Sequence, residues 1–197
     1  MAEAIYKQET FSIGWAFWLQ WTLATVFGGL PIIMVNLGGL GSAATIGAGI
    51  IVGATTGIMQ WLVLRQWFYQ VGWWILATAI GGVVALVIAL IGVMAGSLFQ
   101  FVGLGVGGFI MTGAMAGVMS GTVIGTMQWL VLRRFVYWAG WWILIRAVLG
   151  SIIVVGKLVF VMSGMGVSLS LGEIITGVVS GAVTGVTLVC LLRYPRQ

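Results

Sequence analysis

Few side chains in this chain could carry out chemistry, and their types exclude most enzymes. The 197 residues include no His and one Cys, Cys190, so the usual general base, the commonest metal ligand and any internal disulfide are missing. Of the three acids, Glu3 and Glu9 lie near the N-terminus and Glu173 stands alone. The sequence therefore predicts a non-enzymatic protein without a metal site, and the dispersed bases predict no nucleic-acid binding.

Two glutamines, Gln60 and Gln128, are polar side chains in strongly apolar surroundings, and each is followed by a tryptophan. An amide in hydrocarbon needs a hydrogen-bond partner. A neighbouring helix could supply one through a backbone carbonyl or a threonine. The alternative is axial ligation of a tetrapyrrole, because no imidazole is present. Both glutamines are therefore candidate residues for contact with a ligand or partner.

A basic pair lies in the apolar segment 141–163. Arg146 and Lys157 are eleven residues apart, or three helical turns, so they point to the same side of a helix. Both could extend to the nearest interface, and Lys157 could pair with Glu173, which also fits a capping box with Ser170. A charge within a membrane is otherwise a candidate functional site. We therefore expect Arg146, Lys157 and Glu173 to contact a partner or a polar cavity.

Paired tryptophans begin two of the apolar segments, at Trp73–Trp74 and Trp141–Trp142. Anchoring at the level of the lipid headgroups is the simplest role for such amphipathic rings. Contact with a partner membrane protein, or with a flat pigment or lipid, is the alternative. All four tryptophans are therefore candidate contact residues.

The composition that surrounds these residues is typical of an integral membrane protein. Hydrophobic residues make up 61% of the chain and charged residues 6%, against about 25% charged in soluble domains. Apolar runs of about 20 residues predict an all-α protein with six transmembrane helices. Because the linkers are short, residues 1–197 are predicted to form a single transmembrane domain. The predicted spans are about 13–35, 42–64, 73–95, 104–132, 141–163 and 171–192.

An internal repeat relates the six spans to one another. The segment Gly-Ile-Met-Gln-Trp-Leu-Val-Leu-Arg at 57–65 recurs at 125–133 with one change, and each copy is followed by Gly-Trp-Trp-Ile-Leu. The first span matches the third, with Trp21 aligned to Trp74, and the sixth matches the fourth. The chain is therefore predicted to consist of three helical hairpins. Because each unit has two spans, the repeats are parallel and related by a pseudo-threefold axis.

The third hairpin departs from the repeat at two places. Leu188 and Val189 stand where the other hairpins have Gln-Trp, and two bases replace uncharged residues. A partner or ligand specific to this hairpin would explain the gain of charge. The uncharged counterparts are Thr25 and Thr78 for Arg146, and Asn36 and Ala89 for Lys157.

Glycine recurs at every fourth position in the second, fourth and sixth spans. This spacing places the glycines on one helix face, where the backbones of neighbouring helices can approach closely. We expect these glycine zippers to pack the even-numbered helices near the axis, inside the odd-numbered ones; a glycine-lined pore or cofactor slot is the alternative. The rows are Gly49, Gly53 and Gly57; Gly113, Gly117, Gly121 and Gly125; and Gly177, Gly181 and Gly185.

The distribution of bases predicts the orientation of the chain. The opposite loops, near 36–42, 96–103 and 163–170, contain no Lys or Arg. By the positive-inside rule both termini are predicted to be cytoplasmic. The bases on the side of the termini are Lys7, Arg65, Arg133, Arg134, Arg193 and Arg196.

The Gln-Trp-Leu-Val-Leu-Arg and Gly-Trp-Trp-Ile-Leu segments resemble repeats in uncharacterised multi-pass membrane proteins of cyanobacteria and related phototrophs. The resemblance covers spans two to five well and the other two weakly. It implies a bacterial inner or thylakoid membrane, and it assigns no functional residues.

These observations predict an accessory or scaffold subunit that docks on other membrane proteins, such as a photosynthetic complex, and contacts lipid or pigment. A channel or small-solute transporter subunit and a pigment-binding protein are the alternatives. Membrane lipid is the expected ligand, with chlorophyll or carotenoid as the other candidates. The expected partners are a larger membrane protein complex or further copies of the same chain.

Overall fold

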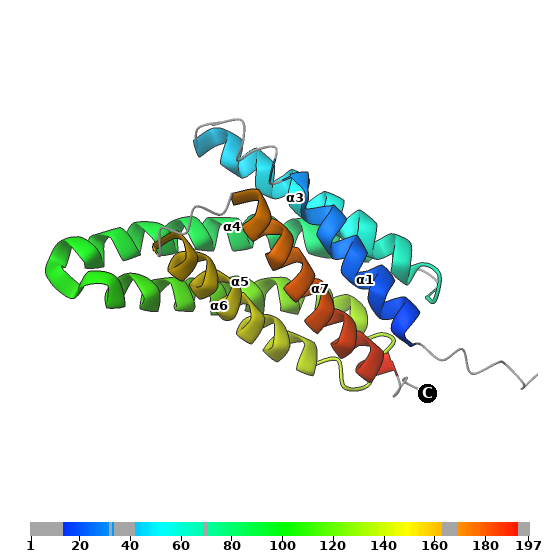
Figure 1. The fold of residues 1–197 in the computed structure, drawn as a ribbon. Helices are drawn as coiled ribbons and strands as arrows, with labels where there is room; N and C mark the ends of the chain where they lie inside the picture. The colour runs from blue at the N-terminus through cyan, green and yellow to red at the C-terminus, as the bar shows by residue number, and fades with distance from the viewer. Residues whose placement is uncertain (1–13, 32, 34–41, 69–70, 163–168, 193–197) are drawn as a thin grey trace, which may run out of the picture.

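The computed structural model describes residues 14–31, 33, 42–68, 71–162 and 169–192, and its elements are helices (Figure 1). The side chains of residues 42–46, 48, 100, 104, 169 and 170 lie outside the described part. A short π-helical turn, η1, joins α4 to α5. The bounds are α1 (Trp15–Gly29), α3 (Ser42–Leu64), α4 (Trp73–Phe99), η1 (Gln100–Leu104), α5 (Gly105–Leu132), α6 (Trp141–Met162) and α7 (Leu169–Leu192).

The helices identify an all-α membrane protein. Four helical segments are long and apolar enough to cross a bilayer: Trp73–Gly103, Gly105–Leu132, Trp141–Met162 and Leu171–Leu192. Helix α1 has 15 residues and the described apolar part of α3 is Gly49–Leu64, both shorter than the roughly 20 residues that a span needs. Parts of the first two predicted spans, at 13, 32 and 34–35 and in side chains of α3, lie outside the described residues.

The turn between α4 and α5 comes later than the sequence predicted. The expected loop near 96–103 is helical as far as Phe99, because Gly96 packs against Phe109 and Thr112 across the hairpin. The chain reverses at Gly103 and Gly105, whose φ angles of +92° and +57° suit a residue without Cβ. Helix α4 therefore has 27 residues. It is about 40 Å long, which exceeds the hydrocarbon thickness of a typical bilayer.

The helices contact one another in the order of the chain and close into a ring. Each helix packs against its predecessor and its successor, and α7 returns to pack against α1. In the described residues the backbones of α3, α5 and α7 do not approach one another closely, so these helices alternate with α1, α4 and α6 around the ring. The prediction that the helices of the even-numbered spans, now α3, α5 and α7, lie inside those of the odd-numbered spans is therefore wrong. One junction is weak, because α6 and α7 make far fewer contacts than any other neighbouring pair.

The glycine rows explain this alternation, because each row, on α3, α5 or α7, faces a helix of the other set, α1, α4 or α6. The glycines of α3 lie against α4, those of α5 against α6, and those of α7 against α1. A Cβ atom at Gly117 would overlap the backbone of Gly150, and one at Gly121 would overlap the carbonyl of Arg146. The α5–α6 backbones approach this closely only because these side chains are missing.

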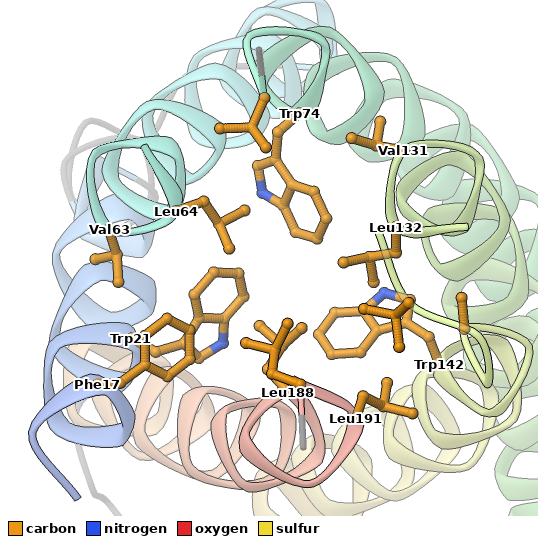
Figure 2. Close-up of a cluster of buried hydrophobic side chains, with 14 of the residues drawn as sticks. Phe17, Trp21, Val63, Leu64, Trp74, Val131, Leu132, Trp142, Leu188 and Leu191 are labelled. Carbon is orange, nitrogen blue, oxygen red and sulfur yellow. The ribbon is translucent and has the colours of Figure 1, made fainter. Parts of the chain in front are cut away.

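The hydrophobic core lies at one end of the ring, where α1 begins and α7 ends (Figure 1). Its centre consists of Trp21, Trp74 and Trp142, each 0% exposed. Figure 2 shows the three indoles pointing toward one another inside the surrounding helices. Their ring centroids are 5.7, 6.2 and 6.4 Å apart in edge-to-face geometry, an arrangement that aromatic quadrupoles favour. We call these three residues the tryptophan triad.

Candidate functional site between helices α6 and α7

Two members of the triad are held by the buried glutamines. Trp74 Nε1 donates to Gln60 Oε1 at 3.1 Å, and Gln60 Nε2 donates to Thr25 Oγ1 at 3.1 Å. Each link joins a different helix, so the amide connects α4, α3 and α1. Both amide atoms are engaged, and the side chain is 1% exposed. The glutamine therefore forms the interhelical hydrogen bonds that were one of its two predicted roles.

The second glutamine repeats this arrangement one hairpin later. Trp142 Nε1 donates to Gln128 Oε1 at 3.0 Å, and Gln128 Nε2 donates to Thr78 Oγ1 at 3.1 Å. Gln128 is fully buried. The predicted ligand contact is therefore wrong for both Gln60 and Gln128, because the amide atoms that would bind a ligand are bonded inside the protein.

The third member of the triad is bonded differently. Trp21 Nε1 donates to Thr184 Oγ1 of α7 at 2.9 Å. Leu188 occupies the position of the glutamine in the repeat, one turn further along α7, and is fully buried. The sequence did not single out Thr184. The signal was the loss of the glutamine at Leu188, which left a buried indole N–H in need of another acceptor nearby.

One substitution from each departure of the third hairpin, Leu188 and Arg146, falls on a single contact of the repeat. In the other hairpins glutamine bonds to threonine across two helices. In the third, Leu188 replaces the glutamine and Arg146 replaces the threonine. The interhelical hydrogen bond that this pair would form is therefore absent from the α6–α7 junction. The same junction is the weakly packed one.

Arg146 points into a cavity of about 210 Å³ between α5, α6 and α7. Its guanidinium lies 5.9 Å from the centroid of the Trp142 ring, and Nη1 is 3.5 Å from Ser180 Oγ, at the limit of a hydrogen bond. Its Nε atom is buried and has no hydrogen-bond partner among the described residues. The sequence predicted a partner contact or a polar cavity for Arg146. The cavity that Arg146 lines is mainly apolar, with Ser120 and Ser180 as its other polar side chains.

A second cavity, of about 250 Å³, adjoins the first between α6 and α7, further from the tryptophan triad. Ile153 lines both cavities, so they follow one seam. We call the two together the α6–α7 cleft. The lining of the second cavity is apolar apart from Lys157 and Thr176. Its other lining residues are Ile152, Ile153, Gly156, Phe160, Gly172, Ile175 and Val179.

Lys157 and Glu173 pair with each other across the outer end of the cleft. Lys157 Nζ lies 2.8 Å from both carboxylate oxygens of Glu173. The side chains are 41% and 21% exposed, so this is a partly open ion pair. The capping box between Ser170 and Glu173 stays a prediction, because the side chain of Ser170 lies outside the described part of the chain.

The paired tryptophans divide between two environments. Trp73 and Trp141 are 63% and 56% exposed, as a residue that contacts lipid or a partner would be. Trp74 and Trp142 belong to the triad, so the predicted external contact is wrong for them. Adjacent helix positions are about 100° apart, which turns the two rings of each pair to different faces.

Comparison of the chain with protein-family models, with curated proteins and with solved structures found no match. The functional argument therefore rests on the geometry of the α6–α7 cleft.

Proposed function

We propose that this protein is a non-enzymatic accessory subunit of a membrane protein complex. In this proposal it holds a membrane lipid in the α6–α7 cleft and docks on other membrane proteins. The observation that carries the proposal is the weak α6–α7 junction. The backbones of the other neighbouring helices approach closely along their length, whereas α6 and α7 do so at few points. An apolar cavity also lies between α4 and α5, but the one at the α6–α7 junction adjoins a partly buried base, Arg146. Apolar cavities with a few placed polar groups are the usual form of small-molecule sites.

The proposed arrangement in the membrane is six spans in three parallel hairpins about a pseudo-threefold axis. The support is the ring order of the helices and the equivalent positions of the tryptophan triad. We further propose that both termini are cytoplasmic, in a bacterial inner or thylakoid membrane. A reporter that is active only in the cytoplasm should be active when fused at Gln197 and inactive when inserted near Gly39. The opposite pattern would reverse the orientation.

The proposed docking surface is the rim of exposed tryptophans at the triad end of the ring. Trp15, Trp73 and Trp141 are 76%, 63% and 56% exposed and begin three different helices. Exposed aromatic rings of this kind suit contact with a larger membrane protein complex or with further copies of the chain. Purification in a mild detergent, followed by identification of co-purifying subunits, tests this part of the proposal.

The contacts at the centre of the ring argue against the two alternative functions. A tetrapyrrole would need an axial ligand, and the amide atoms of Gln60 and Gln128 are engaged elsewhere. A channel along the ring axis would have to pass the triad, whose three indoles fill the centre at one end. An absorption spectrum of the purified protein with bands beyond the aromatic region would favour the pigment alternative instead.

The proposed lipid cleft can be tested by filling it. Gly156 lines the cleft, and a Cβ atom there meets no atom within 4 Å, so Gly156→Phe starts from an open position and adds volume to the cleft. Gly107→Phe in α5 is the matched control, because its position is also open and lies outside the cleft. We expect Gly156→Phe to lose bound lipid in native mass spectrometry while Gly107→Phe retains it. Equal lipid retention in both variants would contradict the proposed site.

A further inference from the structure

The charge of Arg146 has no counter-charge in the described part of the chain. Glu173 is the one acid within the described ranges, and both of its oxygens bind Lys157. The contacts of the guanidinium are a ring face and one distant hydroxyl. An unpaired cation in an apolar cavity is costly, and so is a buried N–H without an acceptor. The cavity therefore lacks an anion with oxygen acceptors.

The orientation of Arg146 fixes where such an anion would sit. Arg146 is five residues from the start of α6, about 7 Å along the helix axis. Helical side chains lean toward the N-terminus of their helix, and the guanidinium accordingly lies over Trp142. The anion site is therefore at the inner end of the cleft, near the membrane surface at which α6 begins.

The rest of the cleft has the form of an acyl-chain site. From Arg146 it follows α6 past Ile153 to Lys157, a rise of about 16 Å, between apolar side chains. An anion with an attached hydrocarbon chain would pair with the partly buried Arg146 and cover this lining at the same time. A free anion would leave the apolar part uncovered.

We propose that the α6–α7 cleft binds an anionic phospholipid from the leaflet on the side of the chain termini. Its phosphate accepts hydrogen bonds from the Arg146 guanidinium and the Ser180 hydroxyl, and one acyl chain lies between α6 and α7. Charge-assisted bonds between arginine and phosphate are among the stronger ones in proteins. This inference rests on the proposed lipid cleft and adds the chemical class of the lipid and the residues that select it.

Native mass spectrometry of the detergent-purified full chain tests the proposal, with dioleoyl phosphatidylglycerol and dioleoyl phosphatidylcholine as probes. We expect the parent protein to retain the anionic lipid at least about tenfold better, as loss of one charged hydrogen bond would imply. Arg146→Thr, which installs the residue of the other two hairpins, should abolish the preference. Arg65→Thr is the matched control, because Arg65 also lies over a tryptophan, Trp61 at 4.9 Å, yet outside the cleft.

The outcomes separate this inference from the proposed function. Equal retention of both lipids by the parent would overturn the anionic selectivity and leave the lipid cleft intact, whereas retention of neither would overturn both. An unchanged preference in Arg146→Thr would overturn the role of the arginine. If that variant does not fold, Arg146→Lys keeps the charge and should keep most of the preference.

Two further arms identify the source of the anion. Inorganic phosphate alone should leave the thermal stability of the parent unchanged, because it lacks the acyl chain that fills the cleft. If phosphate raised the midpoint of thermal unfolding as much as the lipid does, the lipid assignment would be overturned. Arg146→Thr could instead lose a co-purifying membrane protein and keep its lipid. That result would show that a partner helix occupies the cleft, and it would also overturn the lipid assignment.

Discussion

At Gln60 and Gln128 a single amide side chain joins three helices. Each glutamine accepts from an indole of the triad and donates to a threonine on a third helix. In the first of these networks Thr25 also donates to the carbonyl of Trp21, so two triad residues are linked through Gln60. Every polar atom on this path has a partner within the protein, which hydrocarbon could not supply. The glutamines thus orient the indoles, and their amide atoms are engaged within the protein.

Replacement of one of these glutamines should destabilise the fold through the indole that it leaves behind. Gln60→Leu removes the acceptor of the buried Trp74 N–H, and we expect a loss of about 1–3 kcal/mol in the free energy of unfolding. The measurement is chemical denaturation in detergent. Trp74→Phe should lessen the loss in a double-mutant cycle, because no N–H is then left without an acceptor. Additive effects of the two substitutions would contradict the bond.

The sequence predicted the interhelical role of the glutamines as one alternative, but it did not predict the triad. The repeat shows which residues are equivalent and not which way they point. One signal was present: Trp21, Trp74 and Trp142 occupy the same position in all three hairpins, whereas the first hairpin has Gln20 where the others have Trp73 and Trp141. A tryptophan that is kept in every copy is the one that meets its equivalents at the centre.

At the scale of the elements, the glycine rows determine which helices become neighbours. A row brings the backbone of one helix against the next, and the closest approach is between α5 and α6. The spacing of four predicted the close contacts but not the partner helix. A glycine face accepts any smooth helix surface, so its partner depends on the order in which the ring closes.

A methyl group in the α5–α6 contact should therefore cost stability. Gly121→Ala places a Cβ atom against the carbonyl of Arg146, and overpacking of this kind costs about 1–3 kcal/mol. Gly107→Ala in the same helix is the control, because nothing lies within 4 Å of its Cβ position, and it should be neutral or slightly stabilising. Thermal unfolding of the two variants in the same detergent measures the difference. Equal midpoints would show that the contact is loose.

At the scale of the whole molecule, five of the six junctions in the ring are closely packed and the α6–α7 junction is not. The two departures of the third hairpin, Leu188 and Arg146, fall together at this junction. The sequence revealed each substitution, but only the network of the other hairpins shows that both belong to the same missing hydrogen bond. We therefore interpret the cleft as the result of substitutions in the third hairpin that open the α6–α7 junction.

Restoring the repeat should close that junction. In the double variant Leu188→Gln with Arg146→Thr, the introduced amide can donate to the introduced hydroxyl, as in the other hairpins. We expect it to be about 0.5–1.5 kcal/mol more stable than the sum of the two single variants predicts, the typical net worth of one hydrogen bond. It should also retain less lipid than the parent. The measurements are a double-mutant cycle of unfolding and native mass spectrometry, and the absence of coupling would contradict the equivalence of the two positions.

The closed ring has a consequence for the biosynthesis of the chain. The indole of Trp74 donates to Gln60, 14 residues earlier in the chain. Gln60 has therefore already been synthesised when Trp74 leaves the ribosome. Trp21 bonds to Thr184, 163 residues further on. At about 5–20 residues per second, synthesis of that interval takes about 8–30 s. During this time the Trp21 N–H lacks the acceptor that it has in the folded chain, and the face of α1 that packs against the glycines of α7 is uncovered. The ring can therefore close at α1 only after α7 has been synthesised.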